Sequence, residues 1–252
     1  MTEPKIEFTN VHKDFFSKTD VLRVLEDINI TVISGEFVSI IGPSGCGKST
    51  ILDVLTGIVP DYDGSVNVDG IPLEKSNKRM GYMQQKDLLM PWRTLMDNVL
   101  LPLEIQGENI QESKKRIVDM LPIFGLDGFE ESYPHELSGG MRQRAALLRT
   151  ILVDSDIMLL DEPFGALDAI NRSKMQEWLL KIWNEYKHTV IFITHDIEEA
   201  IYLSDKIFIL SNRPAKVLNE LKIEFERPRS KDILVKPEFL EYKKKMIEAL
   251  VE

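Results

Sequence analysis

A glycine-rich segment carries the residue types that bind phosphate. Residues 42–50 follow the pattern G-x-x-x-x-G-K-[ST], with a short apolar run, Phe37–Ile41, before them and a helix-like segment after them. Glycines let successive backbone N–H groups turn toward phosphate oxygens, and the following helix directs its positive end at the same place. Lys48 is predicted to reach the β- and γ-phosphates, and the Ser49 hydroxyl to bind Mg²⁺. The predicted nucleotide-binding residues are Gly42, Pro43, Ser44, Gly45, Cys46, Gly47, Lys48, Ser49 and Thr50.

Two carboxylates follow another short apolar run. Asp161 and Glu162 come directly after Ile157–Leu160. Ligands of parallel sheets bind at the carboxyl ends of the strands, so we expect both acids beside the phosphate loop. Asp161 is predicted to hold Mg²⁺, directly or through water, because this cation prefers oxygen ligands. Glu162 is predicted to polarise the attacking water as general base.

Two more polar residues stand at comparable places. His195 ends the next buried run and is a candidate contact for a γ-phosphate, although a lone histidine there is ordinarily structural. Gln85 lies where alternating segments give way to helical ones. It is either a buried amide or a ligand of Mg²⁺ or water at a hinge.

Composition restricts the class of protein. The chain has 252 residues, 43% of them apolar, and a net charge of −10, with 31 basic and 41 acidic residues. This length predicts one domain with subdomains, and the charge argues against nucleic acid as the main partner. A single cysteine, Cys46, fits a reducing compartment. The first residues lack the pattern of a signal peptide, and no apolar run approaches the roughly 18 residues of a spanning helix, so we expect a soluble chain.

The predicted fold class is α/β, a P-loop NTPase core with a mainly parallel sheet. Short continuous apolar runs predict strands buried on both faces. They are Phe37–Ile41, Ile157–Leu160, Val190–Ile193 and Ile207–Leu210. One helix between them is expected to pack an apolar face on the core. That face consists of Met175, Trp178, Leu179, Ile182, Trp183 and Tyr186.

Two further layers are expected around this core. Alternating residues at 6–8, 28–32 and 66–68 predict an N-terminal antiparallel β subdomain, with turns at Asp63-Gly64 and Asp69-Gly70. Residues from about 86 to 153 predict an inserted helical subdomain. Its helices are expected to be interrupted at Pro91, Pro102, Pro122 and Pro134. The predicted organisation is one domain over 1–252, with a nucleotide-binding core at about 1–85 and 154–215 and a short C-terminal extension at about 216–252.

With these motifs in this order, the chain resembles the ATP-binding subunits of ABC transporters over nearly all of residues 5–215. Gly42–Thr50 resembles their Walker A loop, and Asp161-Glu162 the end of Walker B. Leu137–Gly140, Leu-Ser-Gly-Gly, opens a helix-like stretch and resembles the signature motif, which is nearly private to this family. Gly165–Asp168 resembles the D-loop.

The resemblance also assigns single residues. His195 is similar to the switch histidine, and Gln85 to the Q-loop glutamine, with Gln84 where the family usually has an aromatic residue. Phe15 falls where the family stacks an aromatic ring on adenine, and Phe16 is the neighbouring alternative.

The resemblance implies an ATP hydrolase that uses ATP and Mg²⁺ and works as a head-to-tail dimer. The phosphate loop of one copy would face the signature motif of the other. Residues expected to contact the nucleotide across the dimer are Ser138, Gly139, Gly140 and Asp168. One chain alone would then hold an incomplete site.

The implied partners are integral membrane permease subunits and, indirectly, an external solute-binding protein, which place the chain at the cytoplasmic face of the membrane. Leu89–Val99, Leu210–Pro214 and Glu226–Arg229 are similar to the nitrate, sulfonate and taurine importer group, whose relatives also serve pyrimidine vitamin precursors. The alternatives are the ATPase of an exporter, a non-transport ABC ATPase and a nonhydrolytic nucleotide-binding regulator.

Three features keep two interpretations each. Trp92 either packs inside the helical insertion or belongs to a socket for a helix of the permease. A helical stripe in the tail, which includes Phe239 and Met246, either packs on the core or contacts a subunit or membrane surface. Cys46 is either a small filler of the loop or a thiol whose pKa is lowered by the helix start and Lys48.

Overall fold

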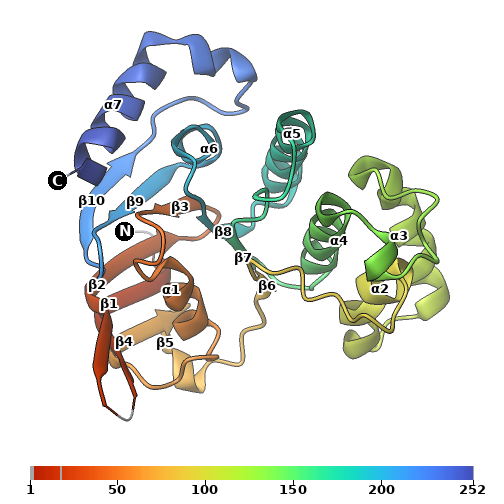
Figure 1. The fold of residues 1–252 in the computed structure, drawn as a ribbon, viewed down its shortest axis with the longest axis horizontal. Helices are drawn as coiled ribbons and strands as arrows, with labels where there is room; N and C mark the ends of the chain where they lie inside the picture. The colour runs from red at the N-terminus through yellow and green to blue at the C-terminus, as the bar shows by residue number, and fades with distance from the viewer. Residues whose placement is uncertain (1–2, 18, 252) are drawn as a thin grey trace. The chain divides into compact units, whose positions relative to one another are not determined.

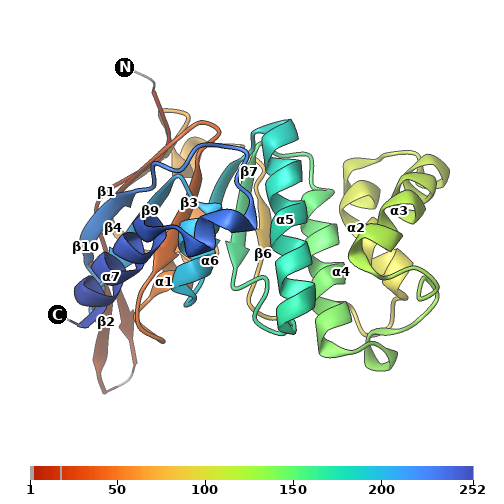
Figure 2. The same cartoon turned by 90° about the horizontal axis from the view of Figure 1, so that it is seen from above.

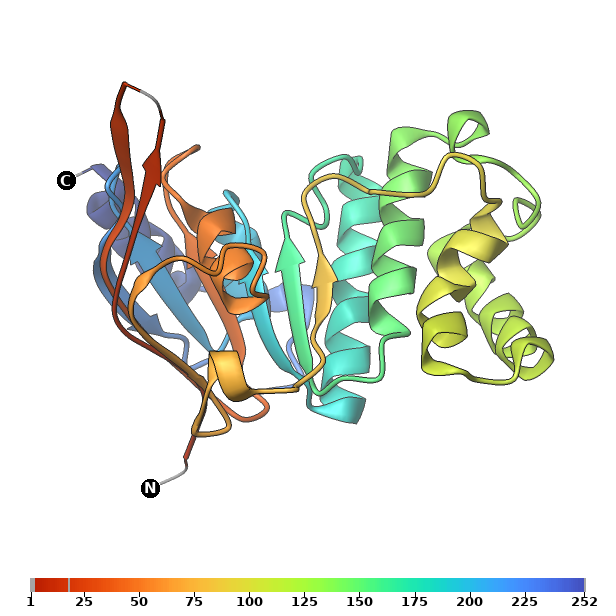
Figure 3. The same cartoon turned by 90° about the horizontal axis from the view of Figure 1, so that it is seen from below.

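The computed structural model describes residues 3–17 and 19–251, and it divides into two compact units. One unit comprises Met1–Lys78 and Leu180–Glu252, and the other Arg79–Leu179. Figure 1 shows the helices and strands of each unit, and Figures 2 and 3 show them from above and from below. No helix within these described ranges is long and apolar enough to cross a membrane.

An antiparallel sheet forms the N-terminal layer of the first unit, as predicted. It contains β1 (Pro4–Phe16), β2 (Val21–Ile33), β4 (Asp63–Val68) and β5 (Ile71–Pro72), in the order β2-β1-β4-β5. Ile6 pairs with residues of both β2 and β4 and is fully buried. Because alternate side chains of a strand point to opposite faces, this layer has one face for the core and one for solvent.

The two predicted turns of this layer differ. Asp69 and Gly70 form the turn before β5, with φ of 52° and 72°. The turn expected at Asp63-Gly64 is wrong, since these two residues begin β4. Gly64 has φ of 96°, and a Cβ there would overlap the carbonyl oxygen of Asn10. Close approach to β1 therefore requires this glycine inside a strand.

The same unit contains strands of the parallel core. They are β10 (Val217–Lys222), β9 (Lys206–Leu210), β3 (Phe37–Ile41) and β8 (Thr189–Ile193), in this order. β3 pairs in parallel with both β8 and β9, and β10 is antiparallel to β9. Every residue of β3 and β8 is buried. These strands are buried on both faces, which explains the absence of apolar–polar alternation in them.

Helices of the first unit lie around these strands. α1 (Lys48–Leu55) follows β3, α6 (Ile197–Leu203) packs on β3, and α7 (Pro237–Val251) packs on α6 and β9. Two 3-10 turns, η1 (Leu73–Lys75) and η3 (Lys231–Val235), complete it. Phe239 and Met246 of α7 are buried, which confirms that the tail stripe packs on the core.

Arg229 fixes the start of this C-terminal extension. Its side chain is fully buried, and its guanidinium donates hydrogen bonds to five backbone carbonyl oxygens. The acceptors are those of Ile201, Tyr202, Ser204, Ile223 and Phe225. Burial and the neighbouring charge of Arg227 lower the pKa of Arg229 to about 10, so it stays charged at neutral pH.

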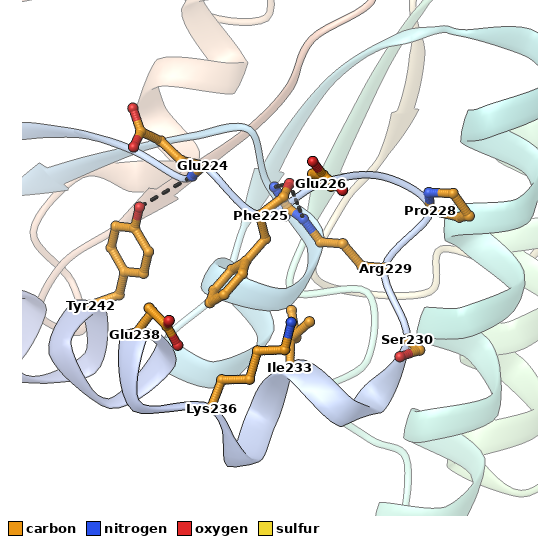
Figure 4. Close-up of a pocket in the computed structure, with 10 residues that line it drawn as sticks. All are labelled: Glu224, Phe225, Glu226, Pro228, Arg229, Ser230, Ile233, Lys236, Glu238 and Tyr242. Atoms are coloured by element: carbon orange, nitrogen blue, oxygen red, sulfur yellow. Dashed lines mark hydrogen bonds between the residues drawn. The ribbon is translucent and has the colours of Figure 1, made fainter.

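A cavity of about 480 Å³ lies between residues 224–233 and α7 (Figure 4). Phe225, Ile233 and Tyr242 supply apolar surface, and Glu224 and Glu238 supply carboxylates. The backbone N–H of Glu224 donates to the Tyr242 hydroxyl at 3.2 Å and joins the strand exit to α7. None of the predicted nucleotide-binding residues lines this cavity.

The second unit contains a parallel strand pair and most of the helical insertion. β6 (Gly81–Met83) pairs with β7 (Ile157–Asp161). The helices are α2 (Leu95–Gln106), α3 (Ile110–Phe124) and α4 (Gly139–Ile151), with the 3-10 turn η2 (Pro134–Glu136) before α4. Each helix has a polar N-cap, supplied by Thr94, Asn109 and Ser138 respectively. These caps satisfy N–H groups that the first helical turn leaves unpaired.

Two of the expected interruptions are wrong. Pro102 lies inside α2 and Pro122 inside α3. A proline removes one backbone donor and costs a few kcal/mol in a helix interior. Packing overrides this cost in α2, where Val99 and Leu103 on either side of the proline are fully buried.

α5 (Ala169–Tyr186) begins in the second unit and ends in the first. Met175, Leu179 and Trp183 are buried, as predicted for its apolar face. Tyr186 is 61% exposed, so the prediction for this residue is wrong. It is the last helical residue, where the chain leaves the helix axis, and its ring lies against that of His188 instead.

Candidate nucleotide-binding site

The phosphate-loop candidate joins the buried end of β3 to α1, as the sequence predicted. Gly45 and Gly47 have φ of 75° and 131°, which a residue with a Cβ adopts only with strain. A Cβ on Gly47 would also lie 2.9 Å from Val24, and one on Gly42 would lie 3.0 Å from Leu210. The glycines are therefore required by both backbone conformation and space.

Lys48 lies inside this loop. Its side chain is buried, and Nζ donates to the carbonyl oxygens of Gly42 at 2.9 Å and Pro43 at 3.0 Å. Ser44 and Gly45 are exposed, while Ser49 and Thr50 are half-buried in the first turn of α1. An ammonium group, exposed loop amides and a helix N-terminus together form a surface suited to a phosphate chain.

Cys46 is 2% exposed and packs within the loop. Burial raises the pKa of its thiol, and the opposing charge of Lys48 only partly reduces this effect. The alternative of a lowered thiol pKa is therefore wrong, because desolvation outweighs the nearby ammonium. Cys46 acts as a small buried filler.

A contact to the outer side of the loop was not predicted from the sequence. The guanidinium of Arg213, in the segment between β9 and β10, donates a hydrogen bond to the carbonyl oxygen of Gly45. Arg213 is exposed, and 168 residues separate the two partners. An arginine–carbonyl contact of this kind has no periodicity or motif, so only the folded chain could identify it.

His195 is exposed in the segment between β8 and α6. Its two neighbours fix this segment. The Thr194 hydroxyl is buried and donates to Glu199 at 2.6 Å, and the Asp196 carboxylate accepts the N–H groups of Glu198 and Glu199 as the N-cap of α6. The imidazole therefore extends from an ordered turn, as a residue that contacts a ligand requires.

The predicted acids lie at the end of β7 in the second unit. Asp161 is the last residue of the strand and is 3% exposed, and Glu162 follows it in a left-handed conformation with φ of 47°. Gln85, just after β6, is exposed, and its Nε2 approaches Glu162 Oε2 at 3.4 Å. The parallel pairing of β6 with β7 brings these residues together from 77 positions apart.

The Leu-Ser-Gly-Gly segment forms the start of α4. Ser138 is exposed, and its Oγ accepts the N–H of Met141 at 3.2 Å. A serine hydroxyl has one donor and two acceptor positions, so this cap leaves the O–H available to an oxygen ligand. Gly139 is exposed and Gly140 half-buried, and both contribute N–H groups of the first helical turn.

Asp168 is exposed immediately before α5. Its Oδ1 accepts the N–H groups of Ile170 and Asn171 at 3.1 Å and 3.0 Å. These hydrogen bonds, chiefly those from Asn171, lower the pKa of the Asp168 carboxyl. The Asp168 side chain therefore caps the N-terminus of α5, a structural role that the sequence had not indicated.

Like Arg213, Gln143 of α4 was not identified from the sequence. It is buried, and its side-chain amide hydrogen-bonds the backbone of both Glu162 and Ala166. The detectable signal is a polar residue among apolar ones, since Ala146 and Leu147, one helical turn later, are also buried. A buried amide on the inner face of a helix requires specific partners.

The two aromatic candidates for stacking on adenine lie at the surface. Phe15 is 40% exposed near the end of β1, with Lys13 Nζ 4.9 Å from its ring centre, and Phe16 is 78% exposed.

Trp92 is 73% exposed, so the interpretation that it packs inside the insertion is wrong. It lies in a loop whose interior is occupied by the side chain of Asn98, which hydrogen-bonds the backbone of Met90 and Arg93 on either side of it.

The strand–loop–helix unit with Gly42–Ser49, together with a strand that ends in Asp161, defines a P-loop nucleotide-binding protein. The family model described as "ABC transporter" matches residues 25–165. The chain belongs to the ABC transporter family.

Relatives of known name cover nearly the whole chain. It is 44% identical over 243 residues to an aliphatic sulfonates import ATP-binding protein, SsuB, of Bacillus cereus, and the match covers 96% of this chain and 94% of that protein. It is 38% identical over 230 residues to the taurine import ATP-binding protein TauB of Rhizobium johnstonii, covering 89% and 88% respectively.

The fold is similar to that of a solved dimeric cassette. The ATP-binding cassette MJ0796, in a post-hydrolysis state bound to ADP and Pi, gives a TM-score of 0.79 and 31% identity. The alignment covers 88% of this chain and all of that one. The predicted fold class, with a P-loop core, an antiparallel β subdomain and an inserted helical subdomain, is confirmed.

The donor set fits ATP and a hard cation. In the first unit, the glycine conformations of the loop, Lys48 and the α1 N-terminus suit phosphates, and Ser49 offers a hydroxyl oxygen. In the second unit, Asp161 offers carboxylate oxygens. Mg²⁺ is usually held by one or two carboxylates plus phosphate oxygens rather than by a cage of protein ligands. Among the described residues there is no group of three or more His, Cys, Asp or Glu side chains able to hold a metal ion.

Proposed function

We propose that this chain is the ATP-binding and hydrolysing subunit of an ABC importer for an organic sulfonate, taurine, nitrate or a related small solute. The observation that carries the proposal is similarity to two import ATP-binding proteins over at least 88% of their lengths. Motif order supports it, since the phosphate loop, the Leu-Ser-Gly-Gly helix and the Asp161-Glu162 strand end are all present and ordered.

The proposed roles follow from the chemistry of each side chain. Residues 42–50 bind the phosphates through Lys48 and through backbone N–H groups, of which Pro43 has none, and Phe15 stacks on the adenine. Glu162 takes a proton from the attacking water, and Gln85 and His195 orient the reacting groups. Ser49, Asp161 and Gln85 would hold Mg²⁺, which would neutralise charge on the phosphates.

The active unit is proposed to be a head-to-tail dimer. Ser138, Gly139 and Gly140 of one copy, with Asp168, contact the nucleotide held by the other. This role is consistent with the exposure of Ser138 and Gly139, and the partial exposure of Gly140, at the start of α4. To shift the equilibrium between open and closed dimer from 1:99 to 99:1, ATP must bind the closed form more tightly by about 5.5 kcal/mol. The γ-phosphate contacts must supply this difference.

Dimerisation tests this proposal directly. Glu162→Gln should bind ATP without hydrolysing it and elute from a sizing column as a dimer only when ATP is present. Glu162→Gln combined with Ser138→Ala should remain monomeric, and Lys48→Ala should bind no ATP. A Glu162→Gln variant that stays monomeric at saturating ATP contradicts the sandwich dimer.

The proposed partners in the membrane are permease subunits, which would hold the chain at the cytoplasmic face of the membrane. Leu88 and Trp92 are 51% and 73% exposed, close together in the chain just after Gln85. Large apolar side chains on a surface loop are suited to a partner helix. Trp92→Ala should lose co-purification with its permease, sought among the proteins encoded at neighbouring loci, while retaining its own ATP hydrolysis. Unchanged co-purification would count against this socket.

The cargo and direction need a different measurement, because the ATPase is not proposed to contact the solute. A solute-binding protein encoded beside the chain should bind an alkane sulfonate, taurine or nitrate in calorimetry. An exporter is the second candidate, and a neighbouring locus with a permease but no binding protein would favour it.

A further inference from the structure

Gln143 connects the start of α4 with the residue that follows β7. It is 7% exposed on the second turn of the helix. Its Nε2 donates to the backbone carbonyl oxygen of Glu162 at 3.0 Å, and its Oε1 accepts the N–H of Ala166 at 2.9 Å. Because one bond uses the donor and the other the acceptor of the amide, the side chain has a single satisfied orientation.

The segment that Gln143 binds is a tight turn. The N–H of Gly165 also donates to the Glu162 carbonyl, at 3.1 Å, so this oxygen accepts two hydrogen bonds. Glu162 has a positive φ of 47°, which is uncommon for a residue with a side chain. Such a conformation persists only where the surroundings hold it. Gln143 supplies one of the bonds that do so.

The first turn of α4 contacts the same segment. A Cβ on Gly140 would lie 3.3 Å from Leu167 Cδ2 and 3.5 Å from the carbonyl oxygen of Ala166. The helix that begins at Ser138 therefore meets the Glu162–Leu167 segment twice, through close backbone packing and through the Gln143 amide. A displacement of the helix start changes the hydrogen-bond geometry at the Glu162 carbonyl.

We propose that Gln143 is a positioning residue that couples the two ATP sites of the dimer. The inference rests on the proposed function, in which Ser138 contacts ATP held by the other copy and Glu162 acts on ATP held by its own. Gln143 then transmits engagement of one nucleotide to the general base of the other site. The nucleotide in each site then influences the position of the same helix, α4. Coupling between two sites requires such a shared element.

The test compares steady-state hydrolysis by the purified full chain with that of two near-isosteric variants. Gln143→Met removes both hydrogen bonds, and Gln143→Glu keeps the acceptor for Ala166 but loses the donor to Glu162. Both should lower kcat about 10- to 100-fold with little change in KM, because a misplaced general base affects the chemical step. The Hill coefficient for ATP should fall from above one in the unchanged chain to one.

A structural effect gives a different pattern. Combined with Glu162→Gln, each Gln143 variant should still form the ATP-dependent dimer, since the dimer contacts are retained. Gln111→Ala, an exposed glutamine at the start of α3, is the matched control and should leave kcat and the Hill coefficient unchanged. If Gln143→Met does not fold, Gln143→Glu supplies the same comparison.

Two results would overturn the coupling. One is a Hill coefficient of one in the unchanged chain, and the other is cooperative hydrolysis retained in the Gln143 variants, whether or not their kcat falls. Failure of the proposed function is separable, because Glu162→Gln alone would then not dimerise with ATP, whatever residue stands at position 143.

Discussion

The side-chain amide of Gln85 lies 3.4 Å from the Glu162 carboxylate, so two residues from separate strand ends of one unit meet. The β6–β7 pairing produces this approach, with Met83 opposite Leu160. Glu162 is thus contacted at its carboxylate by Gln85 and at its backbone carbonyl by Gln143. The general-base role proposed for Glu162 requires such a fixed orientation, since proton transfer depends on hydrogen-bond geometry.

Gln85→Ala should lower kcat for ATP hydrolysis about ten-fold or more while the Kd for ATP changes little. The amide is proposed to orient a reacting group and to supply one Mg²⁺ ligand, and it is not proposed to hold the adenine or the phosphate loop. Gln84→Ala is the matched control, and it also tests which of the two adjacent glutamines has the role. Equal losses in both variants, measured by phosphate release, would contradict the assignment to Gln85.

Arg213→Ala should weaken ATP binding about 3- to 10-fold, the equivalent of roughly one hydrogen bond. The guanidinium holds the Gly45 carbonyl and so keeps the loop in the conformation that presents its amides. Arg213→Lys should retain part of the affinity, because an ammonium group can still donate to one carbonyl. The control is Asn212→Ala, an exposed neighbour, and equal affinity in all three variants by calorimetry would rule out this role.

Cys46 should react slowly with iodoacetamide in the folded chain at about pH 7.5 and rapidly in urea. Its burial raises the pKa of the thiol, so the reactive thiolate is scarce. Because it is the only cysteine in the chain, mass spectrometry reports this site alone, and Cys46→Ser gives the background. Fast labelling of the folded chain at the same pH would contradict the raised pKa.

The same shift sets a direction for stability. Where the folded-state pKa is above the unfolded one, the folded chain keeps a proton that the unfolded chain loses. The contribution of Cys46 to the free energy of unfolding should therefore decrease as pH rises above about 8.5. Comparison with Cys46→Ser in urea titrations about one pH unit below and one above this value measures it. A larger contribution of Cys46 to the free energy of unfolding at the higher pH would contradict the raised pKa.

Asn98→Ala should destabilise the chain by about 1–3 kcal/mol. Asn98 is fully buried in α2, and its side chain accepts the N–H of Met90 at 2.7 Å and donates to the carbonyls of Met90, Arg93 and Thr94. Truncation leaves the Met90 N–H without this acceptor. Trp92→Ala, in the same loop, should change stability by no more than about 0.5 kcal/mol, because its ring is exposed. Urea unfolding of both variants provides the comparison.

Several elements could be predicted from the sequence because their signals are local. The run Phe37–Ile41 became β3 with identical bounds, since continuous burial leaves only apolar residues in such a strand. Ser138 followed by two glycines predicted a helix start, and α4 begins there with Ser138 as its cap. Local signals failed at Pro102 and Asp63-Gly64, where packing and close strand approach outweighed the preferences of single residues.

The sequence by itself determined the chemistry, because a phosphate loop, a strand-end acid pair and a Leu-Ser-Gly-Gly helix start are each encoded in a few adjacent residues. Only the tertiary structure decided which distant side chains hydrogen-bond the backbone of these segments. Arg213 meets Gly45 across 168 positions and Gln143 meets Glu162 across 19. Such contacts leave no periodic trace, since each depends on the direction of one side chain after the strands and helices have packed.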